Sequence, residues 1–132
     1  MRYAIMIVIG LLIGVVGTAF AMNSLNQGPH LDKSVMHMMD FHMDGLHTAI
    51  DQNHCAVTDT LPHIQALRAL SNDIDPIFAK EITDARFNQN ASTLRASIDT
   101  VLANAPTDCA AVGAAMTRIG KSCKGCHQQF KD

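Results

Sequence analysis

The sequence predicts an all-α protein, an antiparallel up-down-up-down four-helix bundle preceded by a separate N-terminal segment. Apolar residues recur at alternating spacings of three and four in four successive stretches, as expected of amphipathic helices. No stretch alternates with the period of two that marks a half-buried strand. The connections between the stretches are short, which favours antiparallel neighbours in a bundle.

Residues 1–21 have the three parts of a secretory signal peptide. Arg2 follows the amino terminus, residues 4–16 are apolar apart from glycines, and Ala19-Phe20-Ala21 is a small-x-small cleavage pattern. The alternative is an uncleaved membrane anchor, because the apolar run is close to the length that spans a bilayer. Glycine and threonine just before the alanines favour cleavage. With either outcome we expect the rest of the chain to be exported, to a bacterial periplasm.

Residues 22–132 are expected to form one domain of about 110 residues, enough for one modest core. Without Arg2, nine basic residues face twelve acidic ones, so the formal charge changes from −2 to −3. This mildly acidic balance, with no basic run, argues against nucleic acid as a partner. No set of residues suggests an active site for substrate turnover, so we expect the protein not to be an enzyme.

Each expected helix is defined by the apolar stripe that it would bury. The stripes are Met36, Met39, Met43, Leu46 and Ile50; Leu61, Ile64, Leu67, Leu70 and Ile74; Phe87, Ala91, Leu94, Ile98, Val101 and Ala105; and Cys109, Val112, Met116, Ile119, Cys123, Cys126 and Phe130. Asp75-Pro76 marks a break after the second stripe. The sequence leaves open whether residues 76–83 extend the second helix, open the third or form a short piece of their own.

Helix-start signals support two of these boundaries. Either Asp59 or Thr60 precedes Pro62, a pattern that predicts the start of the second helix. Thr107 or Asp108 is expected to cap the fourth helix.

The motif with the clearest chemistry lies at the end of the fourth stripe, where residues 123–127 read Cys-Lys-Gly-Cys-His. The C-x-x-C-H spacing puts two cysteines on one turn of a helix, so that both sulfurs can reach the two vinyl groups of one haem. The adjacent His127 then projects its imidazole at the iron. The pattern predicts one covalent haem c, attached through Cys123 and Cys126.

Three other interpretations of the motif are weaker. A thiol redox pair needs a helix N-terminus that lowers a thiol pKa, whereas this motif ends a helix. A structural zinc site needs further ligands, and no second C-x-x-C or H-x-x-H supplies them. A disulfide within the motif would leave His127 without a role.

A C-terminal C-x-x-C-H that closes the last helix of a bundle resembles class II c-type cytochromes, the cytochrome c-prime family. In the family's ending an aromatic and then a basic residue follow the haem histidine by one turn, and Phe130 and Lys131 hold those places. The resemblance also implies the fold of the soluble periplasmic cytochrome b, whose haem lies between a Met of helix one and a His of helix four. Family members often dimerise through their first two helices, which makes a homodimer an open alternative.

The two remaining cysteines fit the same arrangement. In an up-down bundle the first and fourth helices are antiparallel neighbours. From Cys109 to His127 is 18 residues, about 27 Å of helix, and from Met36 to Cys55 is 19 residues, about 28 Å. These spans predict a Cys55–Cys109 disulfide at the end of the bundle opposite the haem, as an oxidising compartment permits. Two buried free cysteines are the alternative.

The same spans put Met36 opposite His127, as the first candidate for the distal iron position. His37 fits the span equally well but lies off the apolar stripe, and Met39 is the other rival. Met36 and Met39 have the alternative role of core filler, since Met suits irregular gaps. A Met ligand would give six-coordinate iron and electron transfer. Five-coordinate iron, as in cytochrome c-prime proper, would leave a pocket for nitric oxide or carbon monoxide.

The first helix also carries side chains suited to a second metal. They are the polar stripe His37, Asp40, Asp44 and His47, and the pairs Met38 with His42 and Met43 with His47. Sulfur with imidazole would suit copper, and imidazole with carboxylate would suit zinc or nickel. The alternative is a solvated helix face.

The sequence is therefore interpreted as an exported electron carrier that exchanges single electrons with redox partner proteins. Lys121, Lys124 and Lys131 surround the attachment motif and form a candidate basic rim for an acidic partner. Their alternative role is to stabilise the end of a helix. The two rival functions are a gas-binding haem protein and a periplasmic metal-binding or sensing bundle.

Overall fold

A computed structural model describes the backbone of residues 2–26 and 30–130, and its contacts divide the chain into two compact units, residues 1–30 and 31–132. The first unit is the single helix α1, Arg2–Asn26, whose described side chains are all exposed. In the part of the chain that the structure describes, no helix has the length and apolarity needed to cross a membrane. The cleaved leader over residues 1–21 stays a prediction.

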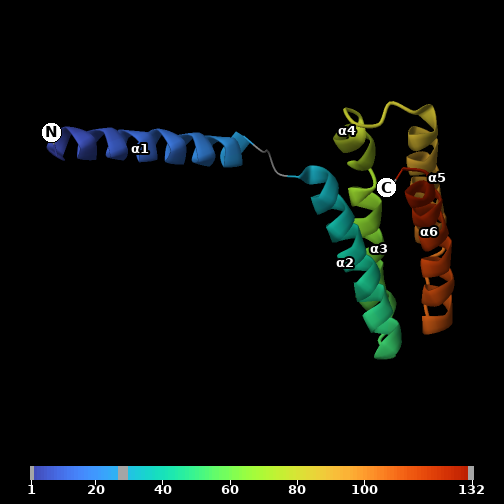
Figure 1. Cartoon of the computed structure of the whole chain (residues 1–132). Helices are drawn as coiled ribbons and strands as arrows, with labels where there is room; N and C mark the ends of the chain where they lie inside the picture. The colour runs from blue at the N-terminus through green and yellow to red at the C-terminus, as the bar shows by residue number, and fades with distance from the viewer. Residues whose placement is uncertain (1, 27–29, 131–132) are drawn as a thin grey trace. The chain divides into compact units, whose positions relative to one another are not determined.

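The second unit is the four-helix bundle that the sequence predicts. Its long helices are α2 (Leu31–Asp51), α3 (Val57–Leu70), α5 (Ala85–Ala103) and α6 (Cys109–Phe130), with the short α4 (Ile74–Phe78) between α3 and α5. Both α2 and α5 pack beside α3 and α6, so the first and last helices of the bundle are neighbours (Figure 1). The described residues contain no strand.

The core lies where the four predicted stripes meet. Each long helix contributes a side chain with no solvent exposure, namely Leu46, Ile64, Ile98 and Ile119. Nearly all other stripe residues are buried or packed against this core. Val35 is also buried, although it lies outside the predicted stripe. The helical period thus predicts correctly which face of each helix points inward.

The second helix of the bundle begins earlier than predicted. Helix α3 starts at Val57, ahead of both Asp59 and Thr60, so Pro62 lies inside it. Proline lacks an N–H and leaves the carbonyl of Thr58 without its helical donor. Because Thr58 is exposed, water can replace that donor. The proline therefore does not mark the helix start.

The segment around Pro76 forms a short helix of its own, which decides among the three alternatives that the sequence leaves open. Helix α4 contains Pro76 at its third residue, near the start where proline is tolerated. It packs against α2 and α5 and thereby covers one end of the bundle.

Asp108 caps α6, as one of the two candidates predicted. Its carboxylate accepts a hydrogen bond from the backbone N–H of Ala111 at 2.8 Å. Replacing Asp108 with Ala should lower the free energy of unfolding by about 1 kcal/mol, because that N–H loses its partner. Denaturant unfolding of D108A and of the matched variant T107A checks this. Equal losses in the two variants would contradict the assignment of the cap.

Candidate functional site

The last two turns of α6 hold the predicted attachment cysteines on the inner face of the bundle. Cys123 and Cys126 are half-buried free thiols that pack against the core. Burial raises the pKa of the Cys123 thiol and of the Cys126 thiol above the ordinary value. A catalytic thiol pair shows a lowered pKa instead. The environment of the motif therefore disfavours thiol redox chemistry.

His127 follows on the same side of α6, one helical turn beyond Cys123. Its side chain is exposed, and within the described residues no hydrogen bond engages its ring. The imidazole is thus available to coordinate a metal at the edge of the bundle. The motif presents two sulfurs and one nitrogen over little more than one turn.

Aromatic rings from three helices meet near the end of α6 that carries these thiols. The ring of Phe87 on α5 is 5.5 Å from Phe78 on α4 and 5.4 Å from Phe130 on α6, measured between centroids. All three pack against the same core as the two cysteines. An aromatic cluster at the helix end that carries two thiols and an imidazole suits a porphyrin, so the residues present fit haem c. Phe78 belongs to none of the predicted stripes, although its spacing of four from Ile74 was a signal for it.

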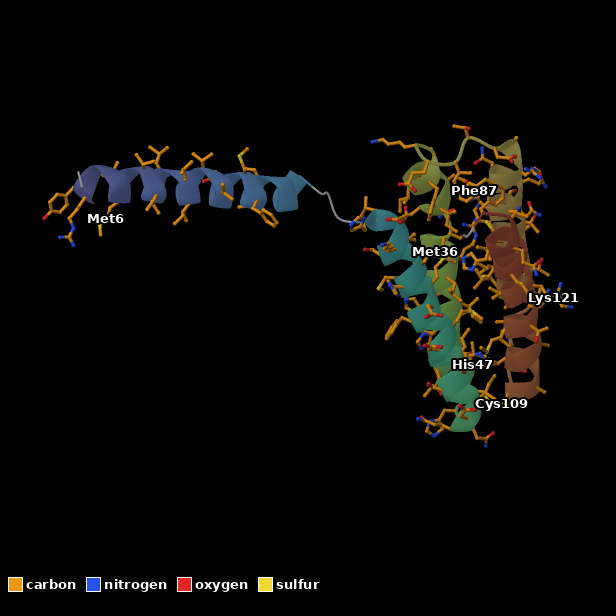
Figure 2. All side chains as sticks on the ribbon, in the orientation of Figure 1. Met6, Met36, His47, Phe87, Cys109 and Lys121 are labelled. Atoms are coloured by element: carbon orange, nitrogen blue, oxygen red, sulfur yellow. A yellow bond between two sulfur atoms is a disulfide. The ribbon has the colours of Figure 1, made fainter. Side chains whose placement is uncertain are left out.

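Helix α2 brings two of the three distal candidates to the core. Met36 is half-buried and packed against the core, and Met39 is 6% exposed. His37 is exposed. Met36 and Phe87 lie toward one end of the bundle, and Cys109 lies at the other (Figure 2). The structure thus separates the motif end from the end that holds the other two cysteines.

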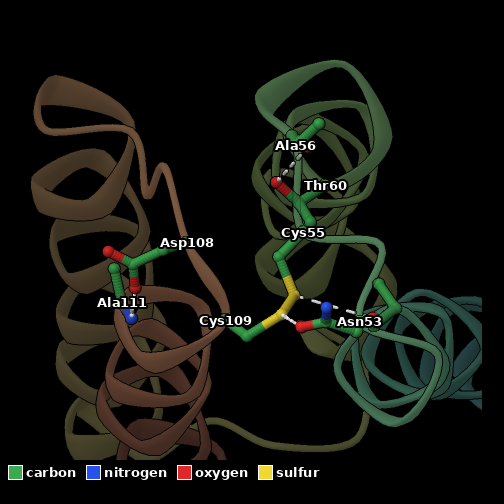
Figure 3. The surroundings of a disulfide bond; sticks show 8 residues. Asn53, Cys55, Ala56, Thr60, Asp108, Cys109 and Ala111 are labelled. Carbon is green, nitrogen blue, oxygen red and sulfur yellow. Dashed lines mark hydrogen bonds between the residues drawn. A yellow bond between two sulfur atoms is a disulfide. The ribbon is translucent and has the colours of Figure 1, made fainter.

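At that other end a bond joins the sulfurs of Cys55 and Cys109, whose Cα atoms are 5.1 Å apart (Figure 3). The turn that positions Cys55 follows α2, where Asn53 adopts a φ of 56°. The N–H of His54 donates to the carbonyl of Ala49 at 2.8 Å, which completes a helix-ending Schellman turn. Asn tolerates this left-handed conformation better than most residues. That the exported protein contains this disulfide is a prediction, which thiol counting tests.

The polar stripe of α2 does not converge on one point. His37, Asp40, Asp44 and His47 are all exposed. Among the described residues, no three His, Cys, Asp or Glu side chains are grouped to hold a metal ion. The stripe extends over ten residues, about 15 Å of helix, which is too long for one ion.

The candidate basic rim is described only in part. Lys121 precedes the attachment motif, Lys124 lies within it, and both are exposed; Lys131 lies outside the described residues. Figure 2 shows Lys121 pointing away from the bundle. Lys121 and Lys124 are therefore accessible to the surface of a partner protein.

An all-α bundle that ends in a C-x-x-C-H helix defines the class II c-type cytochromes. The family model described as Cytochrome C' matches residues 31–131, and the chain belongs to this family. Members of the family bind haem c covalently, so haem c is the cofactor of this chain.

One curated relative shows a shorter similarity. The chain is 44% identical over 45 residues to "Cytochrome c-556" of Agrobacterium fabrum (strain C58 / ATCC 33970), a match that covers 34% of this chain and 31% of the relative. The matched region thus spans about a third of that relative's length. No solved structure matches the chain.

Proposed function

We propose that the protein is an exported carrier of single electrons, with haem c attached through Cys123 and Cys126 and with His127 as an axial iron ligand. The observation that carries the proposal is the pair of half-buried thiols packed against the core, at the end of α6 where the rings of Phe87 and Phe130 meet. Haem c supplies a one-electron iron couple when bound.

The chain's own residues hold and shield the cofactor in this proposal. The two thiols would fix its position on α6 by covalent bonds, and His127 of the same helix would coordinate its iron. Phe78, Phe87 and Phe130 would shield it from water. A packed bundle limits rearrangement between oxidation states, as a carrier requires.

Met36 is proposed as the second axial ligand. It belongs to the helix that neighbours α6, and it packs against the core on the inner face of α2. A thioether there would raise the reduction potential and block external ligands. Met39 is the more buried rival, and His37 has less support because it is exposed.

A second candidate function is the binding of nitric oxide or carbon monoxide by five-coordinate iron. The match to the model described as Cytochrome C' favours this candidate. In this case Met36 would be a core residue and the distal side would remain open.

An absorption spectrum of the reduced, matured protein with carbon monoxide decides between the two. With Met36 as ligand, the gas should leave the wild-type spectrum unchanged and should change that of M36A, because the iron then has an open position. M38A is the matched control, since Met38 is 47% exposed. A large change in the wild type would establish the open site. If carbon monoxide changes the spectrum of M39L but not that of M36A, the ligand is Met39 and not Met36.

The predicted partners and location follow from the surface and the leader. Lys121 and Lys124 are proposed to guide an acidic redox partner, as exposed charges near an interface do. The predicted leader over residues 1–21 supports a periplasmic location. No enzymatic activity is proposed, and a membrane partner is expected only if the leader is uncleaved.

A further inference from the structure

Two histidines meet across the interface between α2 and α3, outside the haem-attachment residues. The Nδ1 atoms of His42 and His63 are 3.1 Å apart, although the residues are 21 positions apart in the chain. Both side chains are half-buried. At this distance one ring donates its Nδ1 proton to the lone pair of the other. Two nitrogen atoms that can act as metal ligands thus lie within hydrogen-bond distance of each other.

A glycine makes this approach possible. A Cβ at Gly45 would lie against the ring of His63, only 2.6 Å from its Nδ1. The His63 ring therefore occupies space that any other residue of α2 would fill. Gly45 is one turn after His42, so the same stretch of α2 supplies one histidine and the room for the other.

We propose that His42 and His63 chelate a divalent transition-metal ion, copper(II) in preference to zinc, between α2 and α3. Bonds of about 2.0–2.1 Å to two imidazole nitrogens place those nitrogens about 2.9 Å apart at a right angle and about 3.4 Å apart at a tetrahedral angle. The observed separation of 3.1 Å lies between these values. Imidazole suits copper, zinc and nickel, and copper(II) binds such donors most tightly.

The ion takes the place of the shared proton. Both nitrogens then present lone pairs to the metal, and the displaced proton moves to Nε2 of the same ring or to water. No third His, Cys, Asp or Glu among the described residues completes the site. Water would fill the remaining positions around the ion. The site is consequently open and its ion exchangeable.

Isothermal titration of the haem-loaded protein with copper(II) tests the proposal. Attached haem removes the thiols of Cys123 and Cys126 as competing ligands. We expect one ion per chain, with affinity at least about tenfold lower in H42A and in H63A, since even indirect partners of a metal site contribute that much. The matched controls H47A and H54A replace exposed histidines and should keep the wild-type affinity.

A third variant tests the geometry while keeping both ligands. In G45A the new Cβ displaces the His63 ring and separates the two nitrogens, so the affinity should fall as in H63A. Electron paramagnetic resonance of the copper complex should show two coupled imidazole nitrogens in the wild type. Titration heat equal to that of buffer in the wild type would overturn the proposal. So would wild-type affinity in both H42A and H63A, or a matching loss in H47A.

Discussion

Replacing both Cys123 and Cys126 with serine should abolish covalent haem attachment altogether. A serine hydroxyl forms no thioether, so haem would depend on His127 and on packing alone. The polypeptide should lose its colour on denaturation and extraction with acidified solvent, and its mass should equal that of the bare chain. The wild type should keep both its colour and its added mass after the same treatment.

The matched control uses the other two cysteines. The variant C55A/C109A removes the same number of sulfurs at the opposite end of the bundle, and it should retain covalent haem. A C123S/C126S protein that keeps its colour through extraction would contradict the assignment of the attachment residues. Equal haem loss in the two double variants would contradict it as well.

Loss of the Cys55–Cys109 bridge should produce the largest change in stability. The bridge closes a loop of 54 residues, and the chain-entropy model gives about 4 kcal/mol for a loop of that size. Domains have a total free energy of unfolding of about 5–15 kcal/mol, so this loss is a large fraction of it. Denaturant unfolding of C55A/C109A, compared with the wild type, measures the effect.

A reductant provides the control for this comparison. It should lower the stability of the wild type toward that of C55A/C109A and leave the variant unchanged. Thiol counting of the native exported protein should find neither Cys55 nor Cys109 free. Two reactive thiols at these positions, or a variant as stable as the wild type, would refute the bridge.

Much of the fold follows from the helical period. Residues such as Leu46, Ile98 and Ile119 repeat at spacings of three and four, and this regularity fixes the buried face of each helix without knowledge of its partners. The antiparallel arrangement then follows from short connections. The antiparallel arrangement also places Cys55 and Cys109 at one end of the bundle, because the rise of a helix per residue is fixed and gives the distance of each cysteine from the haem motif.

The sequence was a poorer guide where solvent exposure, local turn geometry or a contact between helices decides the outcome. Pro62 is tolerated inside α3 because the carbonyl that it orphans is exposed. Asn53 ends α2 in a left-handed turn that a glycine would have signalled more clearly. The contact between His42 and His63 joins two helices, so no spacing within either helix predicts it. The motif itself, by contrast, is local, and its residues were identifiable from the sequence.

Peptide mass mapping of the matured, exported protein tests the central claim most directly. After proteolysis, the fragment that contains residues 123–127 should carry the mass of one haem, and both cysteines in it should resist alkylation. A fragment of unmodified mass, with Cys123 and Cys126 both alkylated, would contradict the account.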